Sequence, residues 1–462
     1  MKLEFMGAAQ EVTGSKHLIT TKKGLKILLD CHGKGAWSDA ALRAELAKHD
    51  LSGADAALCV RIVYGVLQSQ FLLDYDLKNF CTRDFQKLDL TVLDILRIGA
   101  YQILFLDRVP DRAAVNESVN LAKKHGYSSA SGLVNAVLRK LSANRDDLPD
   151  LPKDDIKSLS IEYSCPEWMV ARFIKSLGTD ETREFLKSCD VIPPVCIQTN
   201  WIKTNSENLQ AELRAAGMDI TSHSWLAGCL EARGTGNITQ SKAFRDGKFF
   251  VQDPAARLVT ALGGVQPGMR ILDICAAPGG KSFSAAIDAR NQGEIISCDI
   301  DRRKLKFIQD GASRMGLNMI KTARADGREF HPEWEKRFDL VIADVPCSGF
   351  GILRKKPDIR YKYHGMDDLS GLFALQREIL NNAASYVKPG GKLIYSTCSI
   401  LPEENEFITD AFLKRRPEFI PRDFAASYPG IINHHPGQVT LWPHRHGTDG
   451  FYIRVMKKIP EA

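Results

Sequence analysis

Two cysteines follow apolar runs that are typical of buried strands. Cys347 comes shortly after Phe338–Ala343, and Cys398 shortly after Gly391–Tyr395. Residues beyond the carboxyl ends of parallel strands project into the ligand crevice of an open α/β sheet, so we expect both thiols in one pocket. A thiolate is a strong, soft nucleophile. It suits an electron-poor pyrimidine, in which one carbon must be attacked before its neighbour can react.

A glycine-rich turn upstream of both cysteines predicts a ligand that lies against the backbone. The sequence Leu272–Lys281 joins an apolar strand to a helix. Its paired glycines permit close approach, and the helix N-terminus offers free N–H groups. It is neither a dinucleotide fingerprint nor a phosphate loop, because the glycine spacing of both motifs is absent. The residues that we expect to bind the cofactor are Cys275, Ala276, Ala277, Pro278, Gly279, Gly280 and Lys281.

Acidic residues follow this turn in the order expected for an adenosyl ligand. In such folds an acidic residue at the end of the second strand, about 20 residues past the turn, binds the ribose hydroxyls. Asp299 fits this position best, and Asp301 is the alternative. Asp326, in Arg324–Gly327, is placed to receive the adenine amino group. Alone, each is equally well explained as a turn or cap residue; their order favours the ligand.

The predicted helices and strands that must position these residues divide the chain into segments of different secondary structure. With 462 residues, 44% hydrophobic and 26% charged, the chain should be a soluble protein of about three domains. Strands that alternate with helices predict a doubly wound α/β, Rossmann-like sheet at the C-terminal end, after an all-helical front and a small α/β domain. We expect a β-hairpin-like segment over 1–33, the helical domain over 34–145, a linker over 146–157, the small α/β domain over 158–252 and the catalytic domain over 253–462.

Cysteine usage and charge limit the possible partners. The eleven cysteines include no C-x-x-C pair, so we expect neither a metal site nor disulfides. The net charge of +6 permits nucleic-acid binding without proving it. No apolar run approaches the length of a membrane span, and the N-terminus lacks the pattern of a secretion signal. We therefore expect a cytoplasmic monomer without membrane association.

From about residue 40 onward the chain resembles the Sun/Fmu group of S-adenosylmethionine-dependent RNA cytosine-5 methyltransferases, above all the bacterial small-subunit ribosomal RNA enzymes. The resemblance implies a NusB-like RNA-binding helical front, a small α/β domain and a Rossmann-like methyltransferase sheet. The motifs that carry it, in family order, are VQDPAA (251–256), LDICAAPGGK (272–281), CDID (298–301), ADG (325–327), DLVIADVPCSG (339–349), RKKPDIR (354–360), YSTCSILPEENE (395–406) and TDGFY (448–452).

The same resemblance implies a role for each catalytic residue. Cys398 would add to C6 of a cytosine, so that C5 can take the methyl group of S-adenosylmethionine. Asp344 would hold the protonated N3 side of the ring and also approach the methionine end of the cofactor. Cys347 would resolve the covalent adduct by assisting loss of the C5 proton. DNA cytosine-5 enzymes use a Pro-Cys dipeptide as nucleophile, here Pro346–Cys347; the TCS motif around Cys398 favours the RNA pattern.

Basic residues suggest where RNA would bind. A flipped or unpaired base is needed, because a duplex hides the C5–C6 edge. Four residues close behind the first cysteine are candidates for phosphate contacts: Arg354, Lys355, Lys356 and Arg360. A solvated loop is the alternative for this run. A further set on the helical front is as well explained by a solvated face: Lys123, Lys124, Arg139 and Lys140.

The first 33 residues depart from the methyltransferase pattern. They resemble the opening strands of metallo-β-lactamase-fold RNA nucleases, with strands expected at Lys2–Met6, His17–Thr21 and Leu25–Leu29. No H-x-H-x-D-H motif follows, and His17 and His32 are isolated, so we expect structural histidines and no nuclease site. The segment should be a loosely attached hairpin that replaces the first NusB-like helix and leaves part of the helical core less well covered.

Three functions remain to be separated. The small-subunit (16S-type) ribosomal RNA methyltransferase is favoured, because the NusB-like domain accompanies the ribosomal enzymes; this is an argument by analogy. A transfer RNA cytosine-5 methyltransferase is the first alternative. A non-catalytic NusB-like RNA-binding factor is the second, and the pair Cys347 and Cys398 argues against it.

Overall fold

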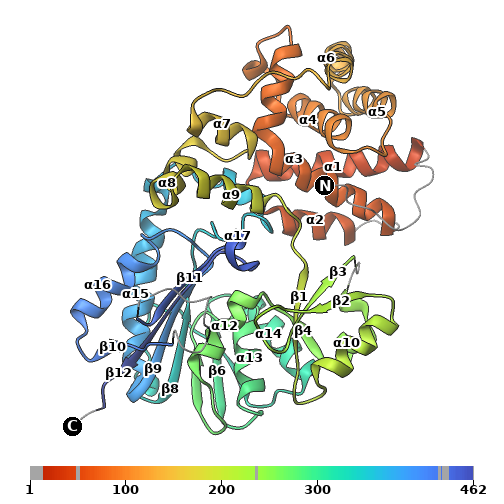
Figure 1. The fold of residues 1–462 in the computed structure, drawn as a ribbon. Helices are drawn as coiled ribbons and strands as arrows, with labels where there is room; N and C mark the ends of the chain where they lie inside the picture. Colours follow the sequence, from red (N-terminus) through yellow and green to blue (C-terminus); the bar gives the residue numbers. More distant parts are fainter. Residues whose placement is uncertain (1–13, 48–52, 235–237, 425–427, 429–435, 461–462) are drawn as a thin grey trace. The chain divides into compact units, whose positions relative to one another are not determined.

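A computed structural model of the chain describes residues 14–47, 53–234, 238–424, 428 and 436–460. The chain forms two compact units (Figure 1). One unit comprises Met1–Val191 together with Leu353–Gly365, and the other comprises Ile192–Ile352 together with Met366–Ala462. The first is all-helical and the second contains every strand of the described residues.

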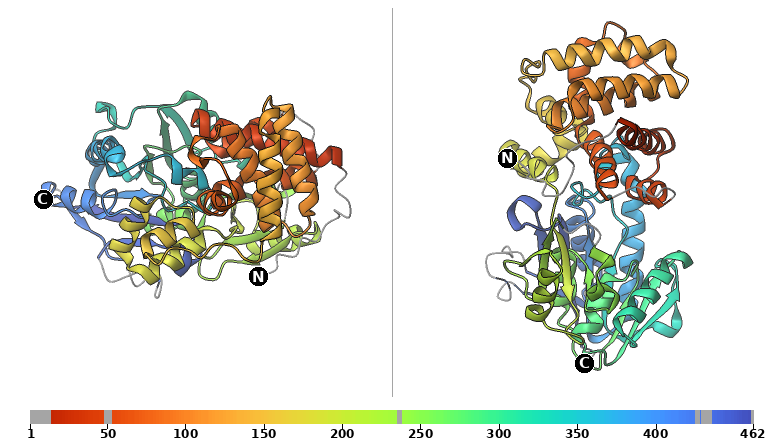
Figure 2. Two further views of the ribbon diagram at one scale, coloured as in Figure 1. Left: turned by 90° about the horizontal axis from the view of Figure 1, so that it is seen from above. Right: turned by 90° about the vertical axis from the view of Figure 1, so that its right-hand side faces the viewer.

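The helical unit buries its core among α1, α3, α4, α5 and α6 (Figures 1 and 2). Apolar residues at helical spacing form this core, as the sequence predicted. The helix α4 begins after Asp89, whose carboxylate accepts a hydrogen bond from the N–H of Thr91. The helices are α1 (Gly14–Lys34), α2 (Ser38–Ala47), α3 (Gly53–Phe80), α4 (Leu90–Phe105), α5 (Asp111–Lys124), α6 (Ser131–Ala143), α7 (Asp155–Glu162), α8 (Glu167–Leu177) and α9 (Thr179–Cys189), with 3₁₀ turns at η1 (Phe85–Lys87), η2 (Ser128–Ala130) and η5 (Pro357–Tyr361).

The prediction of strands at His17–Thr21 and Leu25–Leu29 is wrong, because both segments lie within α1. Leu25 and Leu28 are 0% exposed and pack in the helical core, so this core is covered where we expected it to be open. A short apolar run fits a strand or a buried helix equally well, and tertiary burial decides between them. The strand expected at Lys2–Met6 lies outside the described residues.

The helix α3 is the central element of the helical unit. Among the described residues it is the one helix whose length and apolar content match a membrane span, so the expectation that no apolar run approaches that length is wrong. Its apolar residues, Cys59, Ile62 and Val63 among them, are buried in the helical core. A core helix of a globular protein meets the same criterion, and burial inside the unit accounts for the composition of α3.

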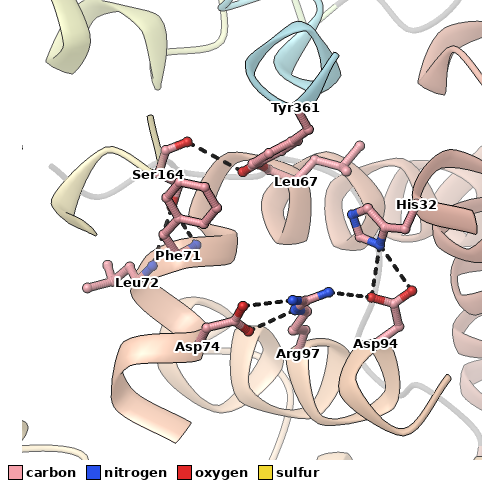
Figure 3. A network of polar contacts seen from close by, with 9 residues as sticks. All are labelled: His32, Leu67, Phe71, Leu72, Asp74, Asp94, Arg97, Ser164 and Tyr361. Carbon is pink, nitrogen blue, oxygen red and sulfur yellow. Dashed lines mark hydrogen bonds and ion pairs between the residues drawn. The ribbon is translucent and has the colours of Figure 1, made fainter. Parts of the chain in front are cut away.

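A kink interrupts α3 at Ser69, whose backbone angles (φ −117°, ψ 16°) are not helical. Such a break exposes backbone groups that must be satisfied elsewhere. The N–H groups of Phe71 and Leu72 donate to the hydroxyl of Ser164, at 3.0 and 3.4 Å (Figure 3). The kink is therefore closed from one side by the turn between α7 and α8.

The segment Leu353–Gly365 also donates hydrogen bonds to α3 just before the kink. The hydroxyl of Tyr361 donates to the Leu67 carbonyl at 2.6 Å (Figure 3), and Arg360 Nη1 donates to the Gln68 carbonyl at 3.0 Å. Arg360 is completely buried and also forms an ion pair with Asp190 at 2.9 Å. A segment distant in sequence thus completes the hydrogen bonding of α3.

An ionic network lies beside the kink (Figure 3). Arg97 binds both carboxylate oxygens of Asp74, at 2.8 and 2.7 Å, and one oxygen of Asp94 at 2.9 Å. His32 Nδ1 lies 3.0 Å from the same oxygen of Asp94, which is fully buried. His32 therefore has the structural role that we expected, as the partner of a buried carboxylate.

The second unit contains a small antiparallel sheet of order β2-β3-β1-β4. Strand β1 occupies the predicted range Val195–Thr199 and pairs with β3 and β4. Ile197 and Phe249 are buried in its core beside Leu209 of α10. The elements are β1, α10 (Ser206–Ala215), β2 (Asp219–Ser222), β3 (Cys229–Arg233), η3 (Ile238–Gln240), α11 (Lys242–Arg245) and β4 (Phe249–Val251).

The large sheet has the order β10-β12-β9-β8-β5-β6-β7, with β11 paired to β12, and β9 to β7 along this path run parallel. One core packs α12, α13 and α14 on one face and another packs α15 and α16 on the opposite face, which confirms the doubly wound, Rossmann-like prediction. The elements are α12 (Pro254–Gly263), β5 (Arg270–Asp273), α13 (Gly280–Asp288), β6 (Glu294–Asp299), α14 (Arg302–Met315), β7 (Ile320–Arg324), η4 (Pro332–Trp334), β8 (Phe338–Asp344), η6 (Met366–Leu369), α15 (Ser370–Tyr386), β9 (Val387–Thr397), α16 (Glu406–Arg415), β10 (Phe419–Pro421), β11 (Gln438–Leu441), α17 (Pro443–His446) and β12 (Phe451–Lys458).

Replacing Leu28 by Ala should destabilise the helical unit by about 2–5 kcal/mol, because it leaves a cavity where a fully buried side chain packs. Urea unfolding followed by hydrogen exchange of α3 and α4 amides measures the loss. Lys22→Ala, an exposed position on the same helix, is the matched control. A Leu28→Ala change no larger than that of the control would mean that α1 is only loosely attached.

Replacing Arg360 by Gln should loosen α3 around its kink, at a cost of about 2–3 kcal/mol, because hydrogen bonds to a charged group are lost. Faster hydrogen exchange in α3 and α9 reports this loss. Arg139→Gln, on an exposed face, should leave exchange unchanged. Reduced RNA affinity with unaltered exchange would instead favour a phosphate contact for Arg360.

Candidate active site

The two predicted cysteines meet at the carboxyl ends of neighbouring parallel strands. Strands β8 and β9 pair in a register that sets Asp344 opposite Ser396. Cys347 and Cys398 follow these strand ends, and their sulfur atoms lie 3.1 Å apart. Both are free thiols and partly exposed. The expected juxtaposition of the two thiols is therefore present.

The environment of Cys347 disfavours the charged form of its thiol. The hydrogen bond with Cys398, burial and the charge of Cys398 raise the pKa of the Cys347 thiol well above its ordinary value. The two sulfur atoms share this hydrogen bond, in which either thiol is able to act as the donor. The choice of Cys398 as the attacking sulfur still rests on the TCS motif around it.

Asp344 is the central carboxylate of the crevice. One of its oxygens accepts a hydrogen bond from Lys281 Nζ at 2.6 Å, and the other accepts one from the Ser396 hydroxyl at 2.7 Å. Burial lowers the pKa of Lys281, but the charge and hydrogen bond of Asp344 outweigh burial and raise it. The Lys281 ammonium also lies 5.3 Å from the ring centre of Phe451. Lys281 was expected to bind cofactor, and here it orients Asp344.

The glycine-rich turn between β5 and α13 has the form of a ligand cradle. Gly279 has φ +111°, and a Cβ there would come within 2.5 Å of the Phe283 ring. No side chain caps the N-terminus of α13, so its first N–H groups face the turn. The N–H of Ala276 donates to the Cys298 carbonyl at 2.7 Å, which holds the turn against the end of β6. Cys275 to Lys281 thus line this cradle as one continuous segment.

The acidic residues expected to bind the cofactor differ in the partners of their carboxylates. Asp299 ends β6, is nearly buried, and accepts a hydrogen bond from the Asp301 N–H at 2.9 Å. Asp301 caps α14 and pairs with Arg303, so its carboxylate has a local role. Asp326 binds Arg328 through both oxygens, at 2.6 to 3.1 Å. Asp299 therefore fits ribose recognition better than Asp301.

Several polar residues beside the crevice escaped the sequence analysis. Asp273, at the end of β5, is fully buried; burial raises its pKa to about 7, and Ser282 donates to it at 2.7 Å. Ser396 and Glu404 also lie behind the catalytic strand ends. These residues lie at or just after predicted strands, and that position could have marked them as part of the site. The motifs around them did not indicate a role for any one of them.

The predicted RNA contacts need one correction. Arg360 is completely buried and bound to Asp190 and to α3, so the prediction that it contacts phosphate is wrong for this structure. Arg354, Lys355 and Lys356 are partly exposed and remain predictions. All four belong to the helical unit, since Leu353–Gly365 folds with it. The basic residues on α5 and α6 are exposed, namely Lys123, Lys124, Arg139 and Lys140.

Three protein families match separate stretches of the chain. Residues 260–457 match the family described as 16S rRNA methyltransferase RsmB/F. Residues 23–143 match the NusB family, and residues 165–239 match the ferredoxin-like domain of RsmF/B-like methyltransferases. The NusB match begins inside the segment 1–33, which we had expected to be foreign, and agrees with the helical structure of α1.

Individual relatives match over nearly the whole chain. The probable ribosomal RNA small subunit methyltransferase B of Bacillus subtilis is 33% identical over 440 residues, which are 94% of this chain and 97% of that protein. The ribosomal RNA small subunit methyltransferase B of Salmonella arizonae is 30% identical over 406 residues, 87% of this chain and 91% of that protein. The crystal structure of PH0851 superposes with a TM-score of 0.81 at 28% identity, covering 97% of this chain and 99% of that one.

Proposed function

The chain belongs to the RsmB/F family of 16S rRNA methyltransferases, and from this premise we propose that it methylates C5 of a cytosine in small-subunit ribosomal RNA. S-adenosylmethionine is the cofactor. The observation that carries the proposal is the 3.1 Å contact between the sulfur atoms of Cys347 and Cys398. Two thiols at the ends of adjacent strands can act on the same base. One would form the covalent bond to it, and the other would assist its release.

The reaction begins with attack by sulfur. The Cys398 thiolate forms a bond to C6 of the cytosine, and the electron pair of the C5–C6 double bond moves toward C5. Asp344, held by Lys281 and Ser396, is oriented to stabilise the protonated N3 side of the ring during this addition. When bound, S-adenosylmethionine supplies an electrophilic methyl group, which the electron-rich C5 takes.

The reaction ends when Cys347 assists removal of the C5 proton. The electron pair of the C5–H bond re-forms the C5–C6 double bond, the bond between C6 and sulfur breaks, and Cys398 leaves as a thiolate. The proton passes to solvent. Because Cys347 contacts the Cys398 sulfur directly, it is placed at the bond that breaks.

The cofactor would be held by the cradle and by the strand ends around it. Gly279 adopts φ +111°, a backbone angle that favours glycine, and the paired glycines of the turn would let a ligand approach its backbone. Asp299 would bind the ribose hydroxyls, and Asp326 would receive the adenine amino group in exchange for part of its contact with Arg328. The remaining residues of the cradle contribute backbone groups: Cys275, Ala276, Ala277, Pro278, Gly280 and Lys281.

RNA would reach this site with its target base unpaired, since the C5–C6 edge is hidden inside a helix. The NusB-like helices offer exposed Lys123 and Lys124 for backbone phosphates, and Arg354 to Lys356 offer a second set. We further propose that the protein works as a cytoplasmic monomer. Transfer RNA is the alternative substrate, and the next experiment distinguishes it from ribosomal RNA.

Purified protein with isotopically labelled S-adenosylmethionine should transfer label to small-subunit ribosomal RNA transcripts and not to transfer RNA. Mapping of 5-methylcytosine in the product identifies the nucleotide. Label found only in transfer RNA would move the assignment to that substrate. Label in neither RNA would remove the proposed activity.

Cys347→Ala should trap a covalent protein–RNA adduct, and Cys398→Ala should prevent one, because only Cys398 bonds to the base. Denaturing gel electrophoresis with labelled RNA detects the adduct. Cys81→Ala, a half-exposed thiol of the helical unit, is the matched control and should behave as the unaltered protein. The reverse pattern for Cys347 and Cys398 would exchange the roles of the two cysteines.

A further inference from the structure

Glu404 is a buried carboxylate directly behind the two cysteines, and the proposed chemistry does not use it. Its side chain is completely buried. It accepts hydrogen bonds from the Ser348 N–H at 2.8 Å, from the Ser348 hydroxyl at 2.5 Å and from Gln376 Nε2 at 2.9 Å. A buried carboxylate needs such donors, because an unpaired charge in a protein interior is costly.

These hydrogen bonds reach the residue next to a catalytic thiol. Ser348 follows Cys347, and Ser399 follows Cys398. The two hydroxyl groups lie 3.1 Å apart, alongside the 3.1 Å contact between the two sulfur atoms. The cysteine loops therefore touch at two successive residues, and Glu404 binds one of these residues directly.

Gln376 extends the same support to the other neighbour of Cys347. Its side-chain amide donates to Glu404 and also to the Pro346 carbonyl at 2.9 Å. Pro346 and Ser348 flank Cys347, so both flanking residues are fixed by the pair of Glu404 and Gln376. The backbone carbonyl of Glu404 in turn accepts from the buried Tyr395 hydroxyl at 2.5 Å, which ties this support to β9.

The loop of Cys398 is held by a different residue. Asn405 accepts a hydrogen bond from the Thr397 hydroxyl at 2.6 Å and donates to the Ser399 carbonyl at 3.0 Å. Two consecutive residues, Glu404 and Asn405, thus hold one cysteine loop each. A change at Glu404 acts first on Cys347, and Cys398 keeps its own hydrogen bonds.

We propose that Glu404 is the positioning residue of Cys347, which it holds where release of the methylated RNA requires that thiol. This inference rests on the roles proposed above for the two cysteines. A Gln at position 404 would keep the size of the side chain but turn one acceptor into an N–H donor that faces the donors of Ser348 or Gln376. The Cys347 loop would then shift, while Cys398 would remain able to attack.

The test measures formation and release of the adduct separately in Glu404→Gln. A displacement of about 1 Å costs up to roughly 100-fold in rate, so we expect release to slow by about 10- to 100-fold. Formation of the adduct should stay within about threefold of the unaltered protein, since Cys398 is unchanged. An RNA adduct should therefore accumulate during turnover with S-adenosylmethionine and a small-subunit ribosomal RNA transcript. Ser348→Ala, which removes one of the same hydrogen bonds, should show a weaker form of this behaviour.

Glu406→Gln is the matched control, because Glu406 is a partly buried carboxylate two residues away that accepts a hydrogen bond from Thr440. It should release RNA normally. Combining Glu404→Gln with Cys347→Ala should slow release no further than Cys347→Ala alone, since the two residues act on the same step.

Two outcomes would overturn the inference. Normal release in Glu404→Gln, with Cys347→Ala still trapping an adduct, would refute the role of Glu404 and leave the proposed function intact. Loss of adduct formation together with a lowered melting temperature would mean that Glu404 serves only the fold. Failure of Cys347→Ala itself to trap an adduct would instead count against the proposed function.

Discussion

The register between β8 and β9 is the constraint on which the active site depends. Parallel pairing of Asp344 with Ser396 sets the two strand ends level, so that the loops beyond them begin side by side. The thiols then need only short extensions to reach 3.1 Å. A shift of β9 by one residue against β8 would turn the side chains of β9 to the opposite faces of the sheet and separate the sulfur atoms.

Backbone contacts make that arrangement rigid. Gly351 donates to the Cys398 carbonyl at 2.9 Å and accepts from the Gly450 N–H at 2.8 Å. A Cβ at Gly351 would lie 1.8 Å from the Gly450 carbonyl, so only glycine permits the three loops to meet. Gly450 of the TDGFY motif thus packs against the loop that follows Cys347 and binds the Cys398 backbone.

The predictable and unpredictable parts of the molecule differ in their physical signals. Central parallel strands such as β5 and β8 contain short buried apolar runs, Ile271–Leu272 and Leu340–Ala343, so their positions were evident. Strand β7, with the sequence IKTAR at an edge of the sheet, lacks that signal and was missed. The apolar run within α1 was assigned to strands, because five residues cannot distinguish a strand from a buried helix.

The roles of buried polar residues could not be predicted for a different reason. Basic and acidic runs resemble solvated loops, whereas folding buries single members of them, Arg360 and Glu404. The sequence did predict that the two cysteines lie together, because each strand-end motif carries its residue to the same edge of the sheet. The supporting hydrogen bonds come from residues whose partners are far away in the chain, and no local pattern records them.

The return of Leu353–Gly365 to the helical unit makes that unit discontinuous in the gene. A fragment that ends at residue 191 would contain all nine long helices of this unit that the structure describes, yet it would lack Arg360 and Tyr361. The Leu67 and Gln68 carbonyls would lose their donors, and Asp190 its cation. Separately expressed pieces of this protein therefore cannot follow the linear boundaries of its domains. The thirteen residues Leu353–Gly365 would have to be joined to the helical fragment to restore it.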